Sequence, residues 1–181
     1  AVCIDTTIES DFKITPAQLE AAITPKTKLF MFSSPCNPSG SVYSREELTA
    51  LAKVLEKYPN IYVVADEIYE HINFSGTFCS IGSIPGMLER TVTVNGVAKA
   101  FAMTGWRIGY IGAPEFIAKA CTKIQGQVTS GANSIAQRAT ITAVEADPSV
   151  LNEMVSAFKN RRDLVVGLVN QIPGFKLNVP E

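Results

Sequence analysis

The sequence lacks the residue clusters from which metal sites and disulfide frameworks are built. It has a single histidine, His71, and its four cysteines lie far apart and form no C-x-x-C pair. Structural zinc sites use four closely grouped Cys or His ligands, so this spacing predicts no zinc cluster and no other metal site. We therefore expect the cysteines to be reduced thiols, which is their usual state in the cytoplasm.

The glycine-rich loops that bind nucleotide phosphates are also missing. The sequence contains no Gly-Lys pair, which excludes the motif G-x-x-x-x-G-K-[ST], and it contains no G-x-G-x-x-G. An apolar run followed by Asp66-Glu67 resembles the magnesium-binding segment of nucleotide hydrolases. That alternative needs a phosphate loop, so it stays open only if the loop lies outside these residues.

Neither sign of charge dominates, and no long apolar run is present. The formal net charge is -1, whereas a nucleic-acid surface needs a dense positive face. No apolar run approaches the roughly 20 residues of a membrane helix, and no signal peptide opens the chain. We therefore expect a cytoplasmic protein with no nucleic-acid or membrane partner.

Short apolar runs alternate with amphipathic helical patterns, which indicates an α/β domain with a mostly parallel sheet. Both ends of the chain, residues 1–4 and 175–181, also read as strands, and they suggest a piece of a longer protein. The apolar runs predict strands over residues 28–34, 61–65, 91–94 and 108–111. Caps and periodicity predict helices from Pro16 to before Thr24, from Ser44 to about Tyr58, over 114–127, over 133–146 and from Pro148 onward.

Polar residues follow three of the predicted strands, where ligands bind in open α/β sheets. Asp66 ends the second strand, and alone it would be read as a helix cap or turn residue. Lys99 follows the third strand, and alone it would be read as a surface charge. Its apolar neighbours are an unusual setting for a free ammonium, and desolvation would make the amine more nucleophilic. Arg107, eight residues later between glycines, has a guanidinium suited to holding a phosphate.

Three segments together resemble the class I and II aminotransferases of pyridoxal 5′-phosphate (PLP) fold type I, and within them the bacterial aspartate aminotransferase branch. They are residues 34–40 (SPCNPSG), 64–69 (VADEIY) and 95–109 (NGVAKAFAMTGWRIG). The order and spacing of the three motifs make this resemblance specific, and it covers nearly the whole chain.

The resemblance implies a role for five residues. Lys99 would be the catalytic residue, holding PLP as a Schiff base, and Arg107 would bind the phosphate. Asp66 would pair with the pyridinium nitrogen, and Tyr69 would donate to the phenolic oxygen of the cofactor. Asn37 would contact that oxygen and the substrate carboxylate. These roles agree with the chemistry of PLP, because a carboxylate beside the ring nitrogen favours the protonated ring that withdraws electrons.

Two features depart from the family pattern. Many members have serines just before the lysine, one of them a phosphate ligand, where this chain has Gly96 and Ala98. The chain is also about half as long as a family member and lacks a further phosphate loop, a stacking aromatic ring and a carboxylate-binding arginine. We therefore expect this piece alone to be inactive.

The resemblance implies a three-layer αβα architecture, an incomplete large domain of fold type I. We expect residues 1–147 to form part of that PLP-binding domain and residues 148–181 to form a connecting helix and the start of the small domain. The parent protein would be a homodimer that transfers an amino group from aspartate, or a similar amino acid, to 2-oxoglutarate. The alternatives are an aminotransferase for prephenate, aromatic amino acids or alanine, a PLP lyase, and the non-catalytic PLP-binding domain of a transcription regulator. His71 is expected to be structural and Trp106 to pack beside the cofactor.

Overall fold

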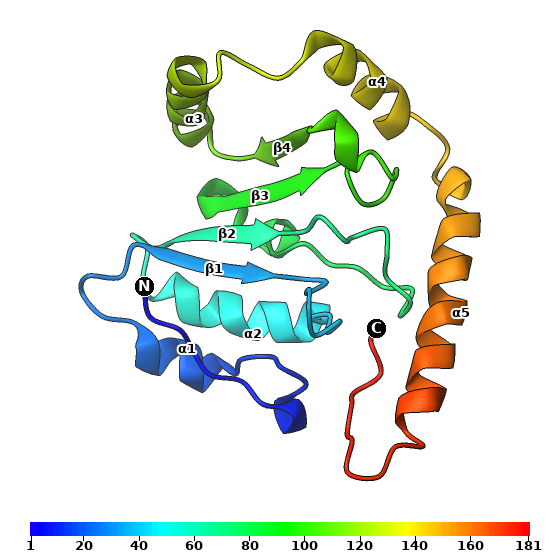
Figure 1. Ribbon diagram of the computed structural model, residues 1–181. Helices are drawn as coiled ribbons and strands as arrows, with labels where there is room; N and C mark the ends of the chain where they lie inside the picture. Colours follow the sequence, from blue (N-terminus) through cyan, green and yellow to red (C-terminus); the bar gives the residue numbers. More distant parts are fainter.

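A four-stranded sheet forms the centre of the molecule in the computed structural model, which describes all 181 residues (Figure 1). Strands β1 to β3 run parallel, and β4 is antiparallel to β3. The strands follow one another in sequence order across the sheet, as β1 (Leu29–Ser33), β2 (Tyr62–Asp66), β3 (Thr91–Gly96) and β4 (Gly109–Gly112). The prediction of an α/β fold with a mostly parallel sheet is confirmed.

The five predicted helices are all present, and the first two begin directly after their predicted capping residues. Thr15 and Gln18 form a reciprocal capping box at the start of the first helix, and Ser44 and Glu47 form another at the start of the second. A short 3-10 turn capped by Asp147 precedes the last helix. The helices are α1 (Pro16–Ala22), α2 (Arg45–Glu56), α3 (Glu115–Val128), α4 (Ser134–Val144) and α5 (Asn152–Val169).

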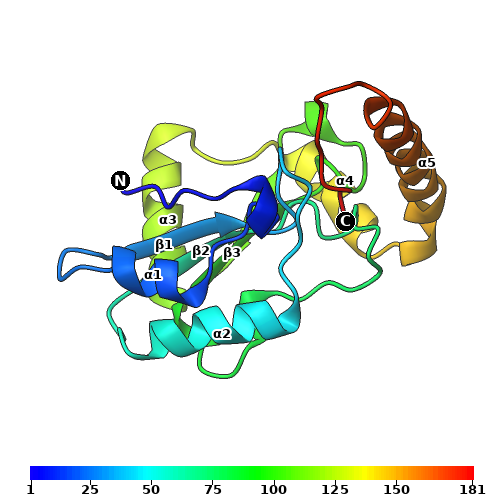
Figure 2. The same ribbon diagram turned by 90° about the horizontal axis from the view of Figure 1, so that it is seen from below.

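The core lies between α2 and one face of the sheet (Figure 2). Leu48, Leu51 and Leu55 of α2 are almost completely buried, as are Val63 and Ala65 of β2. Alternate residues of a strand point to the same face, so the residues on either side of Ala65 face away from α2. This one-sided core fixes β1 and β2, and with them the loops at their carboxyl ends.

Arg90, just before β3, hydrogen-bonds to the carboxyl-terminal end of α2 and to the loop that follows it. Its Nε donates to the carbonyl of Ile61 at 2.9 Å and its Nη1 to the carbonyl of Leu55 at 2.8 Å. Its Nη2 donates to the carbonyls of Tyr58 and Ile61. The guanidinium thus adds hydrogen bonds to carbonyls at the carboxyl end of α2 and in the loop after it, where a positive charge is favourable.

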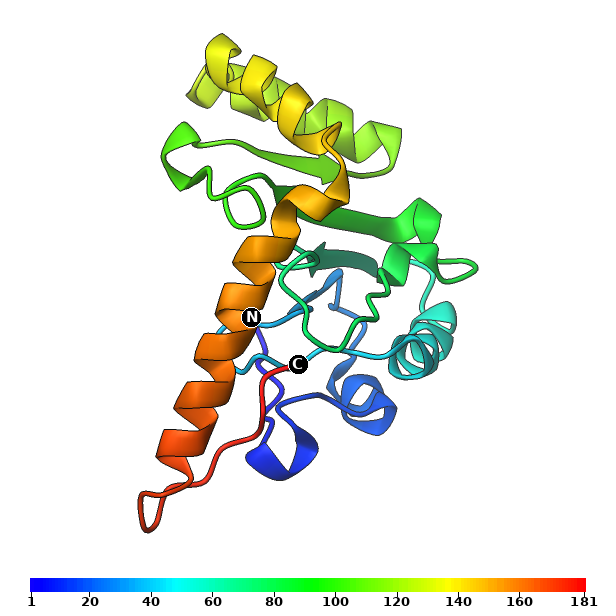
Figure 3. The same ribbon diagram turned by 90° about the vertical axis from the view of Figure 1, so that its right-hand side faces the viewer.

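Helix α3 lies on the opposite side of the sheet from α2 (Figure 2), so the elements form three layers. Its aromatic contact with the sheet joins Phe116 to Tyr62, with ring centroids 5.7 Å apart. Helix α5 runs beside the strand ends, and the residues after it return to the body of the molecule (Figure 3). There Glu181 N donates to the carbonyl of Gly40 at 2.9 Å, and Asn178 Nδ2 donates to that of Ile8 at 2.7 Å.

Two of the predicted strands are wrong. Residues 1–4 and 175–181 are not in the sheet, because neither segment forms a ladder of backbone hydrogen bonds with a neighbour. Strand β1 is at the edge and is only partly buried, with Leu29 48% and Met31 66% exposed. The apolar composition of this strand predicted a buried strand, but its position at the edge of the sheet leaves these side chains exposed. No helix has the length and apolar character needed to span a membrane.

Candidate functional site

The loop after β1 carries Asn37 at its tip. Two backbone hydrogen bonds close this loop: Gly40 N donates to the carbonyl of Cys36 at 2.8 Å, and Cys36 N donates to that of Ser41 at 3.0 Å. Asn37 lies between these bonds and is exposed. The closed loop therefore presents the amide of Asn37 beyond the carboxyl end of the sheet.

Asp66 and Tyr69 follow at the end of β2. Asp66 is the last residue of the strand, paired in register with Ser33 on one side and Val94 on the other. It is half-buried, and its Oδ1 accepts a hydrogen bond from Ile68 N at 3.2 Å. The Tyr69 hydroxyl then meets Asn37, whose Nδ2 lies 3.2 Å away. The loops after β1 and β2 are thus joined by two predicted site residues.

Lys99 lies in the segment that follows β3. It is half-buried, and its Nζ lies 5.7 Å from the centroid of the Tyr69 ring, with no hydrogen bond or ion pair of its own. Just upstream, a Cβ on Gly96 would come within 2.9 Å of the carbonyl oxygen of Ile108. The missing side chain at Gly96 therefore allows the close approach of the chain beside β4 that fixes the start of the Lys99 segment.

Arg107 forms its side-chain hydrogen bond within its own turn. It follows the 3-10 turn Thr104–Trp106 with a left-handed φ of 55°, and its exposed side chain donates through Nη1 to the carbonyl of Thr104 at 3.1 Å. The Thr104 hydroxyl in turn donates to the carbonyl of Ala98 at 3.1 Å, next to Lys99. The structure thus brings Asn37, Tyr69 and Lys99 together, whereas the Arg107 guanidinium hydrogen-bonds to Thr104. Trp106, which we expect to pack beside the cofactor, is 46% exposed.

Glu67, to which no role was assigned from the sequence, is only 4% exposed. Burial raises the pKa of this carboxyl to about 7, against the opposing effect of hydrogen bonds from the Ser80 hydroxyl and the Ile81 backbone. The signal was present in the sequence, because Val63, Ala65 and Glu67 alternate and so share the face covered by α2. Glu67 therefore points away from the face that carries Asp66.

Two further residues gained no role from the sequence. Asn95 is 8% exposed, and its Nδ2 donates to Glu70 Oε1 at 2.7 Å. This bond joins the turn after β2 to the end of β3. No pattern in the sequence pairs an Asn and a Glu that are 25 residues apart, so only the tertiary structure could reveal it.

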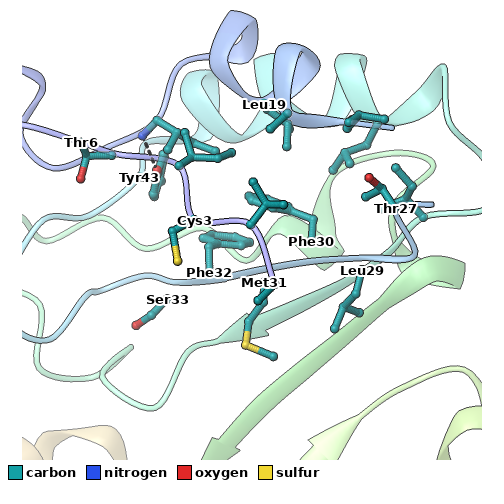
Figure 4. A pocket seen from close by; sticks show the side chains of 18 of the residues that line it. Cys3, Thr6, Leu19, Thr27, Leu29, Phe30, Met31, Phe32, Ser33 and Tyr43 are labelled. Carbon is teal, nitrogen blue, oxygen red and sulfur yellow. Dashed lines mark hydrogen bonds between the residues drawn. The ribbon is translucent and has the colours of Figure 1, made fainter. Parts of the chain in front are cut away.

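An apolar cavity of about 820 Å³ lies elsewhere, between the first residues of the chain and β1 (Figure 4). Phe30, Phe32, Leu19 and Cys3 contribute to its lining. None of the five predicted site residues lines it. The polar cluster at the strand ends and the apolar cavity are therefore separate features.

The groups at the strand ends fit PLP by their chemistry. A primary amine near a phenol suits an aldehyde beside a phenolic oxygen, and Lys99 and Tyr69 supply these groups. The carboxylate of Asp66 suits a protonated ring nitrogen, and a guanidinium suits a phosphate. The amine of Lys99 forms no ion pair with a carboxylate of this chain.

The fold and the strand-end motifs define an α/β domain of PLP fold type I. The sequence profile of the family described as Aminotransferase class I and II matches residues 2–181. The chain therefore belongs to this family, whose members use PLP, and within it to the branch of aspartate and aspartate/prephenate aminotransferases.

Relatives in sequence and in structure agree on this branch. The chain is 53% identical over 175 residues to an aspartate/prephenate aminotransferase from Nitrosomonas europaea, an alignment that covers 96% of this chain and 44% of the relative. A crystal structure of the aspartate aminotransferase from Rhizobium meliloti superposes with a TM-score of 0.95 at 44% identity, covering 97% of this chain and 44% of that one.

A second solved structure, the aspartate aminotransferase from Thermus thermophilus with maleate, gives a TM-score of 0.84 at 42% identity. It covers 91% of this chain and 43% of that one. The chain thus spans a little under half the length of the relatives that it matches.

Proposed function

We propose that the chain is part of a PLP-dependent aminotransferase that moves an amino group from aspartate to a 2-oxo acid such as 2-oxoglutarate. The observation that carries this proposal is the meeting of Asn37, Tyr69 and Lys99 beyond the carboxyl ends of three parallel strands. The names of the relatives support aspartate as the amino donor. Residues 1–147 would belong to the large domain and residues 148–181 to the connecting helix and small domain of a homodimer.

PLP, when bound, supplies an electron sink for the bonds at the amino acid's Cα. Lys99 would hold the cofactor through its amine and, once displaced by the substrate amine, would carry the proton that leaves Cα. Tyr69 would donate its hydroxyl proton to the phenolic oxygen, and Asn37, already within 3.2 Å of that hydroxyl, would steady it. Asp66 would keep the ring nitrogen protonated. Arg107 would bind phosphate after its guanidinium leaves the carbonyl of Thr104.

Prephenate is the second candidate acceptor, because the Nitrosomonas europaea relative is named for both substrates. The matched relatives are named as aminotransferases, which favours an enzyme over the PLP-binding domain of a regulator. Since the chain spans under half of their length, we propose that catalysis needs residues outside this chain. The tests therefore use the longer protein that contains these 181 residues.

Borohydride reduction of the longer protein with PLP, followed by peptide mapping, should place the label on Lys99. We expect Lys99→Ala to lower transamination of aspartate and 2-oxoglutarate by roughly a hundredfold to ten-thousandfold, the usual contribution of a general acid-base group. The matched control is Lys119→Ala, because Lys119 is an exposed lysine paired only with Glu115 at 2.6 Å. A label on Lys119, or full activity in Lys99→Ala, contradicts the proposal. Parallel assays with prephenate as acceptor identify the substrate.

A further inference from the structure

The turn that follows Tyr69 contacts the Lys99 segment on both sides of the lysine. Glu70 Oε1 accepts a hydrogen bond from Asn95 Nδ2 at 2.7 Å, four residues before Lys99. The ring of His71 packs edge-on against Phe101, two residues after Lys99, with centroids 6.2 Å apart and planes inclined by 67°. Glu70 and His71 also lie 3.3 Å apart, from Oε1 to Nε2.

These contacts continue the sheet beyond the end of its backbone ladder. The last backbone bond between the two segments joins Glu67 N to the carbonyl of Val94 at 2.9 Å. Beyond it the chains separate into a turn and a loop, and side chains make the remaining links. Asn95 makes one of these links. It is buried, its Oδ1 accepts a hydrogen bond from Gly96 N at 2.7 Å, and its Nδ2 donates one to Glu70.

The geometry of the two links restricts the Lys99 segment more than either link would alone. A hydrogen bond from an amide to a carboxylate is stronger than one between neutral groups, and partial burial of Glu70 adds to this. One link before the lysine and one after it leave little freedom for the intervening residues. Tyr69 is directly attached to the same turn, so its position relative to the Lys99 amine follows from these links.

We propose that Glu70 and His71 are positioning residues, which hold the Lys99 segment against Tyr69 through Asn95 and Phe101. We call these four residues the Lys99 bracket. The effect of the bracket on catalysis rests on the proposed function, but its effect on the Lys99 segment does not. Neither Glu70 nor Asn95 is assigned a contact with cofactor or substrate, so both act through the residues that they hold.

Hydrogen exchange in the longer protein without PLP tests the bracket independently of any activity. We expect Glu70→Ala and Asn95→Ala to speed exchange of backbone amides in residues 97–103 by roughly tenfold, the factor that corresponds to one lost hydrogen bond. Glu70→Gln keeps a neutral acceptor for Asn95, so its exchange should be slower than that of Glu70→Ala and closer to that of the wild type. The control is Glu20→Ala, which removes a surface pair with Lys57 at 2.8 Å. Unchanged exchange in Glu70→Ala overturns the proposal, and this variant serves alone if Asn95→Ala fails to fold.

Kinetics and absorbance with PLP test the catalytic consequence. Because small misplacements of reacting groups cost up to about a hundredfold, we expect Glu70→Ala to lower kcat roughly tenfold to a hundredfold with little change in KM. The pH midpoint of the bound cofactor's visible absorbance should shift in Glu70→Ala and return in Glu70→Gln. Equal losses in the Ala and Gln variants overturn the bracket, because they would point to charge rather than to the hydrogen bond. If the wild type has no aminotransferase activity but the variants show the expected hydrogen exchange, the proposed function is refuted. The positioning role of the Lys99 bracket is then still supported.

Discussion

Helices α2 and α3 lie on opposite faces of the same sheet and have similar lengths, yet they are packed very differently. Five residues of α2 are buried, and none of α3 is. In α3 the apolar side chains of Phe116, Ile124 and Val128 are between 59% and 74% exposed. The two sequences have comparable amphipathic patterns, so the pattern shows which face of a helix is apolar but not whether this chain covers it.

The difference follows from what each helix faces. Helix α2 meets Val63 and Ala65 of the sheet, and Ile81 and Met87 from the loops join the same cluster. On the other face the outward side chains of β1 are exposed, and α3 is held by the contact of Phe116. The free energy of unfolding of the 181-residue chain should therefore fall when buried residues of α2 are truncated. It should change little when matched residues of α3 are truncated.

The largest expected effect comes from truncating the buried side of α2. Leu51 is 1% exposed, so Leu51→Ala should lower the free energy of unfolding by about 2–5 kcal/mol, through lost burial and the cavity left behind. Ile124 is 65% exposed, and Ile124→Ala should change the free energy of unfolding by less than about 0.5 kcal/mol. Urea unfolding followed by circular dichroism measures both. Equal losses would show that α3 is packed as firmly as α2.

The second comparison uses one buried and one exposed carboxyl. The pKa of Glu67 is raised by burial from 4.5 to about 7 in the folded protein, so the folded state binds the proton more tightly than the unfolded state does. The resulting stability is fully present below pH 4.5 and is lost as the pH rises to about 7, by up to about 3 kcal/mol.

Glu67→Gln should remove this dependence, since glutamine does not titrate. Glu115→Gln in α3 changes an exposed carboxyl and should leave the slope of stability against pH as in the wild type. Urea unfolding at several pH values between 4.5 and 7 gives both slopes. If Glu67→Gln keeps the wild-type slope of stability against pH, the pH dependence arises from another titrating group.

The smallest expected effect concerns the helix caps. Ser44 accepts from Glu47 N at the start of α2, and Asn133 accepts from Ala136 N at the start of α4. Ser44→Ala should lower the global free energy of unfolding by about 1 kcal/mol, because α2 unfolds with the core. Asn133→Ala should instead speed hydrogen exchange at the start of α4 without shifting the global transition. A global shift in both variants would make the two regions one cooperative unit.

Local signals explain why much of the fold was predictable. Thr15-Pro16 and Ser44-Arg45-Glu46-Glu47 encode helix starts in neighbouring residues, and α1 and α2 begin there. The apolar runs that predicted the sheet became β1 to β4. Residues 1–4 and 175–181 were also predicted as strands but have no ladder partner, and pairing is not a local property. That is why those two predictions failed.

The candidate site divides in the same way. Asn37, Asp66, Tyr69 and Lys99 could be named from the sequence, because they lie in the three motifs that resemble the aminotransferase family. The burial of Glu67 was also readable from its alternation with Val63 and Ala65. The assignment of roles to these residues remains a proposal.

The sequence by itself indicated the four strands β1 to β4, the helices, the family motifs and the residue types available for chemistry, because these signals depend on neighbours along the chain. Only the tertiary structure decided that Tyr69 meets Asn37, that Arg107 turns to Thr104, and that Glu70 holds Asn95. The first and last of these contacts join residues 32 and 25 positions apart. Their formation depends on strand order and loop closure, which no single segment encodes.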